Sequence, residues 1–71
     1  MRIELRHLRY AIAAAEHQSF RRAAQALGVH ESAVSRRIRD LEDEIGAALF
    51  IRHHGGVSLT YAGQRFLGRA R

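Results

Sequence analysis

The pattern of apolar and polar positions in the middle of the chain predicts two helices joined by a tight turn. Apolar side chains recur at helical spacing over residues 19–28, where Gly28 ends the first helix. A second apolar stripe repeats over residues 31–45, with serine and arginine on the opposite side. The small residues Ala23 and Ala24 let the two helices cross closely. Together these features predict a helix-turn-helix.

A further helix is predicted ahead of this pair, over residues 4–17. Ser19 is the expected cap of the helix that follows, because its hydroxyl can accept a hydrogen bond from a backbone N–H of the first turn. The apolar positions of the first helix that we expect to face the core are Leu5, Leu8, Ile12 and Ala15.

The segment after Gly46 predicts a β-hairpin and a last helix. Residues 49–52 and 57–59 are expected as two short strands around a glycine-containing loop at 53–56. Thr60 is the expected cap of the last helix. One side of that helix, the only candidate seam for a dimer, carries Ala62, Phe66 and Ala70.

The composition excludes several classes of protein. The chain has no cysteine, which excludes disulfides, thiolate metal sites and a cysteine nucleophile. No apolar run approaches the roughly 20 residues of a membrane span, and no signal-peptide pattern opens the chain. We therefore expect a cytoplasmic protein with no membrane partner. Serines and histidines are present, but they form no catalytic constellation, so we expect no enzyme.

The charge of the chain indicates a polyanionic partner. Lysine and arginine total 12 against 7 acidic residues, a formal net charge of +5. Every basic residue is an arginine, whose planar guanidinium suits phosphate and guanine. The arginine codon preference of a GC-rich genome is an equally open explanation for that choice. With a helix-turn-helix, the positive charge predicts double-stranded DNA as the partner.

The outward face of the helix over residues 31–45 holds the first candidates for DNA contact: Ser32, Ser35 and Arg36. Hydroxyls reach phosphates or base edges, and arginine can pair with the O6 and N7 atoms of guanine. Arg37, nearer the flank of the apolar stripe, and Arg39, further along the helix, are expected to contact phosphates.

The last third of the same helix is acidic and contains Asp40, Glu42, Asp43 and Glu44. One explanation is local pairing of Arg36 with Asp40 and of Arg39 with Asp43, worth about 0.2–0.5 kcal/mol per pair. We favour a second explanation, in which the acidic end points away from the phosphates and discourages docking in the wrong orientation.

A series of short motifs runs along essentially the whole chain at a characteristic spacing. These motifs are the run 5–10, Ser19-Phe20, Ala23-Ala24, Leu27, the run 32–36, Ile38, Leu41-Glu42, Gly46, Leu49-Phe50, Arg52, Leu59-Thr60 and Ala62-Gly63. Each motif is weak alone, but the combined pattern is strongly specific and resembles the N-terminal DNA-binding domain of LysR-type bacterial transcriptional regulators. The resemblance implies DNA contact at Ser32, Ser35 and Arg36.

The expected fold class is therefore mainly α, a winged helix-turn-helix with three helices, a two-stranded wing hairpin and the start of a linker helix. Residues 1–60 are expected to form the DNA-binding domain, and residues 61–71 to begin a linker or dimerisation helix. That helix still continues at Arg71, which favours a piece of a longer protein over a short native one. The resemblance implies a missing C-terminal domain that binds a small-molecule effector, and a homodimer or higher oligomer of the full-length protein. No cofactor is expected in this segment.

Three positions depart from the pattern of the family. His30 replaces the usual serine or threonine and is a poor cap, so the first turn is expected to use Ser32 instead. Glu31 replaces the usual glutamine; it is either a partner of the helix dipole, which we favour, or a reader of the cytosine N4 donor. Arg21 stands where a hydroxyl residue is frequent. Arg21 and Arg22 either contact a DNA strand or face solvent, and the sequence does not decide between these two alternatives.

The predicted wing has few charges for this family. Arg52 flanks it as a candidate contact to the phosphate backbone. The tip contains His53 and His54, whose charge below about pH 6.5 would make a contact of the wing with DNA depend on pH. We favour ordinary exposed histidines, and expect no metal site because no third ligand is evident. A protein-interaction module built on the same fold is the alternative function, and it would need exposed apolar residues on the helix over residues 31–45.

Overall fold

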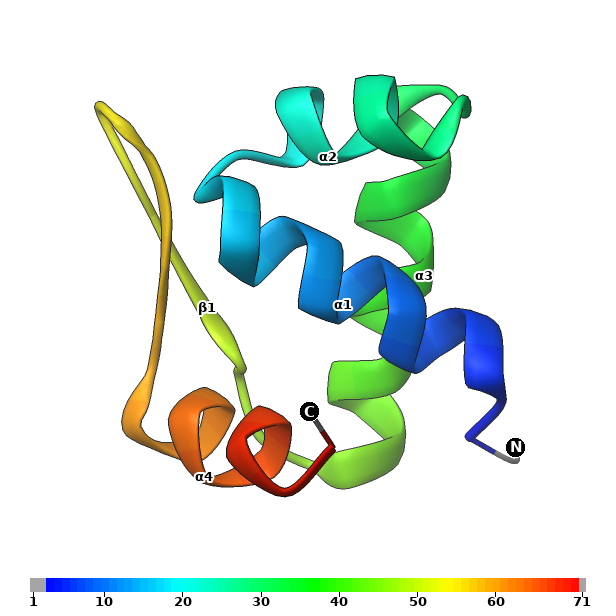
Figure 1. Cartoon of the computed structure of the whole chain (residues 1–71). Coiled ribbons are helices and arrows are strands. Elements are labelled where there is room, and N and C mark those ends of the chain that lie inside the picture. Colours follow the sequence, from blue (N-terminus) through cyan, green and yellow to red (C-terminus); the bar gives the residue numbers. More distant parts are fainter. Residues whose placement is uncertain (1–2, 71) are drawn as a thin grey trace.

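The computed structural model describes residues 3–70 and, for side chains, residues 3–68. Its elements are α1 (Leu5–His17), α2 (Phe20–Leu27), α3 (Glu31–Ile45), β1 (Phe50–His53), β2 (Gly56–Leu59) and α4 (Tyr61–Ala70). Figure 1 shows α1 in the centre, with α3 on one side and the hairpin on the other, while α2 and α4 lie at opposite ends. The predicted class, a mainly helical fold with a two-stranded wing, is confirmed.

The helix-turn-helix has the predicted boundaries, and local caps set three of its four helix ends. The Ser19 hydroxyl accepts the N–H of Arg22 at 3.1 Å and starts α2. Gly28 ends α2 with φ +73°, a conformation that favours glycine. Its N–H bonds the carbonyls of the last turn. Gly46 ends α3 in the same way, with φ +82°. Local contacts therefore mark both ends of α2 and the C-terminal end of α3.

One apolar core joins all the elements. The helix-turn-helix contributes Phe20, Ala23, Ala24, Val34, Ile38 and Leu41, and the rest of the chain contributes Ala11, Ala14, Leu49, Phe50, Val57 and Leu67. Half of the first group is on α3, which buries one stripe and leaves its opposite face to solvent, as an amphipathic helix does.

The buried face of α1 differs from the prediction. Leu5 is 71% exposed, and the buried residues are His7, Ala11 and Ala14. Ile12 and Ala15 pack against the core only at its margin. The helix is thus rotated by about a quarter turn from the orientation that the larger side chains suggested. Small alanines permit a closer approach of α1 to α2 and α3 than leucines would, and close packing decided the orientation.

The wing is a tighter hairpin than predicted. β1 and β2 pair antiparallel from Phe50 opposite Leu59 to His53 opposite Gly56. Only two residues, 54 and 55, remain as the turn, so the expected four-residue loop is wrong and β1 starts one residue later. A Cβ at Gly56 would collide with the carbonyl oxygen of Gln18, which accepts the N–H of Val57 at 3.0 Å. The wing is therefore held against the corner between α1 and α2.

Thr60 starts α4 as predicted, and it also joins that helix to the chain before β1. Its hydroxyl accepts the N–H of Gly63 at 2.9 Å and donates to the carbonyl of Ala48 at 2.6 Å. Leu67, which the sequence analysis did not single out, is the fully buried anchor of α4. In the described part of the chain, no helix is long and apolar enough to cross a membrane.

Candidate nucleic-acid interface

The outward face of α3 holds the polar residues predicted for DNA contact. Ser32, Arg36 and Arg39 are exposed, and Ser35 and Arg37 are half-buried beside them. The half-buried position of Arg37 agrees with its expected place at the flank of the apolar stripe. The exposed face carries no large apolar side chain, which the protein-interaction module would require.

The arginines on this face are not paired with the acids of their own helix. Within the described residues, no ion pair joins Arg36 to Asp40 or Arg39 to Asp43, so the explanation by local pairing is wrong. Arg36 and Arg39 therefore present unneutralised guanidinium groups to whatever approaches the helix.

Glu42 has a structural role that the sequence analysis missed. Its Oε2 accepts the backbone N–H groups of Leu49 at 2.7 Å and of Phe50 at 3.2 Å. This carboxylate therefore connects the last third of α3 to the first residue of the wing, and charge-assisted hydrogen bonds of this kind are strong. Glu42 belongs to the acidic end of α3, and its carboxylate positions the wing. No signal within the helix itself could have predicted the two backbone donors, which lie seven and eight residues further on.

The first turn of α3 has no side-chain cap. His30 makes no capping hydrogen bond, as expected of a poor cap. The prediction that Ser32 caps the first turn in place of His30 is wrong, because the Ser32 side chain makes no hydrogen bond within the described part of the chain. Glu31 is the one acidic residue in the first turn. The N-terminal end of α3 is thus open, with backbone N–H groups that have no partner inside the helix.

A groove of about 230 Å³ lies between the starts of α2 and α3 and the wing. It is lined by Ser19, Phe20, Arg21, Glu31, Arg52, His53, Gly56 and Val57. The fold therefore brings together predicted site residues that lie up to about 30 positions apart in the sequence. Arg22 is exposed beside Arg21 but does not line the groove.

Arg52 is bound to two other elements of the surface. Its Nη2 donates to the hydroxyl oxygen of Ser35 at 2.9 Å, and its guanidinium lies 4.8 Å from the ring centroid of Phe20. The ring of Phe50 meets Phe20 edge-on, with centroids 5.6 Å apart. Arg52, predicted as a DNA contact at the flank of the wing, is therefore oriented by α2 and α3 together.

The two wing histidines differ in their surroundings. The Nδ1 of His53 accepts the N–H of Gly55 at 3.2 Å, and its Nε2 lies 2.8 Å from the hydroxyl of Ser58. With Nδ1 as the acceptor, the neutral ring carries its proton on Nε2 and donates it to Ser58. His54 is exposed in the turn and makes no hydrogen bond within the described residues. In the same residues, no three metal-ligating side chains come together.

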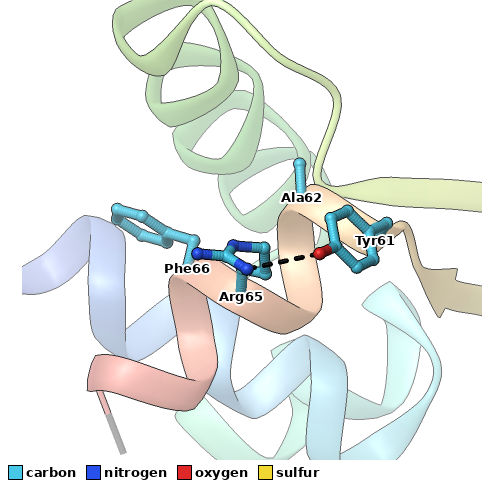
Figure 2. Close-up of a pocket in the computed structure, with 4 residues that line it drawn as sticks. All are labelled: Tyr61, Ala62, Arg65 and Phe66. Atoms are coloured by element: carbon cyan, nitrogen blue, oxygen red, sulfur yellow. Dashed lines mark hydrogen bonds between the residues drawn. The ribbon is translucent and has the colours of Figure 1, made fainter.

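The predicted dimer seam on α4 is partly used inside the domain. Ala62 and Phe66 are half-buried against the core, and the side chain of Ala70 lies outside the described residues. Ala62 and Phe66 line a hollow of about 310 Å³ together with Tyr61 and Arg65, and Figure 2 shows these four side chains. Arg65 donates to the Tyr61 hydroxyl at 3.2 Å.

The fold and the exposed polar face of α3 define a winged helix-turn-helix of the transcription-regulator class. The family model for bacterial regulatory helix-turn-helix proteins of the LysR family matches residues 5–64. The chain therefore belongs to the LysR family and carries its helix-turn-helix DNA-binding domain.

Individual relatives agree with this assignment. The chain is 48% identical over 64 residues to the HTH-type transcriptional regulator BudR of Klebsiella aerogenes, covering 90% of this chain and 45% of BudR. It is 48% identical over 71 residues to the HTH-type transcriptional regulator YnfL of Escherichia coli, covering 100% of this chain and 24% of YnfL. The chain thus spans less than half the length of either regulator.

A solved complex shows the same fold on DNA. The crystal structure of the BenM DNA-binding domain with its catB site 1 DNA superposes with a TM-score of 0.90 at 43% identity, covering 94% of this chain and 75% of that one. These similarities favour sequence-specific DNA binding over the protein-interaction module.

Proposed function

We propose that the N-terminal half of α3 enters the major groove of duplex DNA, with Ser32, Ser35 and Arg36 at the base edges and nearby phosphates. The observation that carries this proposal is the exposed face of α3, where Arg36 and Arg39 have no acidic partner among the described residues. Arg37 and Arg39 contact phosphates. Arg21 and Arg22, at the start of α2, and Arg52, His53 and His54, on the wing, lie along the DNA backbone.

A salt titration tests this proposal. Fluorescence anisotropy with a labelled duplex of mixed sequence is measured at about 50 mM and about 200 mM salt, and each neutralised phosphate adds about −0.9 to the slope of log K against log salt. The Arg36→Ala/Arg39→Ala variant is expected to have a shallower slope. Arg65→Ala, which removes a charge on α4, is the matched control and keeps the slope. Absence of binding at the lower salt concentration would contradict the proposal.

Glu31 has two possible roles within this function. It lines the same groove as Arg21 and Arg52, and it stands in the first turn of an uncapped helix. We propose that it is mainly a partner of the helix dipole. Selection of binding sites from random duplexes by the wild type and by Glu31→Gln tests this assignment, because loss of a cytosine preference in the variant would instead make Glu31 a base reader.

We further propose that these residues belong to a longer regulator. In that protein α4 continues as a linker helix, pairs with a second subunit, and leads to a C-terminal domain that binds a small-molecule effector in the cytoplasm. The 71-residue chain alone is expected to be mostly monomeric at micromolar concentration, because a lone short helix is a marginal dimer seam. Fusion to an artificial coiled coil should raise the affinity for DNA through effective concentration. Sedimentation that shows a tight dimer of the bare chain would contradict this part.

A further inference from the structure

Arg52 lies where three elements of the interface meet. β1 carries it, α3 supplies the hydroxyl of Ser35 at 2.9 Å, and α2 supplies the ring of Phe20 at 4.8 Å from the guanidinium. Phe20 is only 5% exposed, so the surface that Arg52 covers is part of the core. A guanidinium stacked on a fixed ring has lost much of its rotational freedom before any partner arrives.

The hydrogen bond to Ser35 also orients the hydroxyl. Its oxygen accepts from Nη2, so the single hydroxyl proton must point elsewhere and is free to donate. Within the described residues, the other guanidinium N–H groups of Arg52 have no hydrogen-bond acceptor. Two sets of donors thus stand side by side, and one of them is positively charged. An anionic acceptor suits them better than a neutral base edge.

We infer that Arg52 is a positioning residue for Ser35, and that the two form a preorganised seat for one DNA phosphate. The Ser35 hydroxyl donates to a phosphate oxygen, and a second guanidinium N–H of Arg52 donates to the same phosphate. This inference rests on the proposed DNA binding and adds to it a dependence between the two residues. A wing arginine and a helix serine that bound DNA independently would show no such dependence.

A double-mutant cycle in the 71-residue chain tests the inference. Affinities for a labelled mixed-sequence duplex at about 50 mM salt are measured for the wild type, Ser35→Ala, Arg52→Gln and the double variant. Ser35→Ala is expected to lower affinity about fivefold in the wild type and less than about twofold in Arg52→Gln. Arg52→Gln should also reduce the salt slope by about 1, a change that a purely structural residue would not cause.

The matched control is the same cycle with Arg39→Gln, which changes an exposed arginine on α3 that makes no hydrogen bond to the Ser35 hydroxyl within the described residues. In this control cycle, the fold-losses in affinity from Ser35→Ala and Arg39→Gln are expected to multiply. If Arg52→Gln fails to fold, Arg52→Lys serves in its place, because lysine keeps the charge and the stem but lacks the planar fork. In that background Ser35→Ala should again cost less than about twofold.

The outcomes separate this inference from the function on which it rests. A wild-type chain that does not bind the duplex at low salt overturns both. The other outcome is a wild-type chain that binds, while the fold-losses in affinity from the Ser35 and Arg52 substitutions multiply as in the control cycle. That outcome overturns the positioning role and leaves the DNA binding intact.

Discussion

The outward face of α3 and the wing use their polar side chains in opposite ways. Ser32, Arg36 and Arg39 are exposed and make no hydrogen bond or ion pair within the described residues. On the wing, Arg52 is bound to Ser35 and stacked on Phe20, and His53 is bound at both ring nitrogens.

This difference indicates a division of labour between the two regions. Side chains without internal partners can adjust to the hydrogen-bonding pattern of a base pair, which suits Ser32 and Arg36 to sequence recognition, while Arg39 lies further along the helix and is assigned to a phosphate. Side chains that already have partners lose little entropy on binding, but they accept only one geometry, which suits them to the repeating phosphate backbone.

The largest effect is expected at the contact between the wing and the body of the domain. Gly56→Ala should destabilise the fold by about 3 kcal/mol, because the new Cβ meets the Gln18 carbonyl and φ is +134° at this position. Thermal unfolding measures the loss. Gly55→Ala is the control, since its Cβ would make ordinary contact with the His53 ring at 3.6 Å. Equal stability of the two variants would show that the wing is not anchored at Gly56.

The carboxylate that joins α3 to the wing comes next. Glu42→Ala leaves the N–H groups of Leu49 and Phe50 without their acceptor and should cost about 2 kcal/mol in urea unfolding. Asp43→Ala removes an exposed carboxylate one residue further on and should change stability by less than about 0.5 kcal/mol. If the two substitutions cost the same, Glu42 does not hold the wing in solution.

A third pair of substitutions separates base reading from general attraction on α3. On a duplex selected by the protein from a random pool, Arg36→Ala should cost about 1–3 kcal/mol and relax preference at one position per half-site. Arg39→Ala should weaken binding to all sequences about equally. Competition binding with selected and scrambled duplexes distinguishes the two results. If the affinity of both variants falls by the same factor on every duplex, Arg36 does not read a base.

The smallest effects are expected at the wing tip. His53→Ala removes hydrogen bonds to Gly55 and Ser58 and should lower stability by about 0.5–1 kcal/mol. His54→Ala removes an exposed side chain with no such bonds and should stay within about 0.3 kcal/mol of the wild type. Thermal unfolding of both variants measures this difference. A larger loss for His54→Ala would mean that the turn depends on a contact absent from the structure.

The extent of the helices in the helix-turn-helix could be predicted from the sequence because their signals are local. Ser19 and Gly28 bound α2, and Gly46 ends α3, through contacts within four residues of the helix ends. The apolar stripe of α3 also identified its exposed face, because a helix that buries one side must show the other to solvent.

The tertiary structure alone decided the buried face of α1, the role of Glu42 and the grouping of Ser35, Arg52 and Phe20. The α1 sequence contains two neighbouring stripes that could both be buried, and only packing against α2 and α3 selects the alanines. The contact of Arg52 with Ser35 spans 17 positions in the sequence, and the carboxylate of Glu42 reaches across the turn to β1. Contacts between distant residues depend on how the elements pack, and no periodicity within one element carries that information.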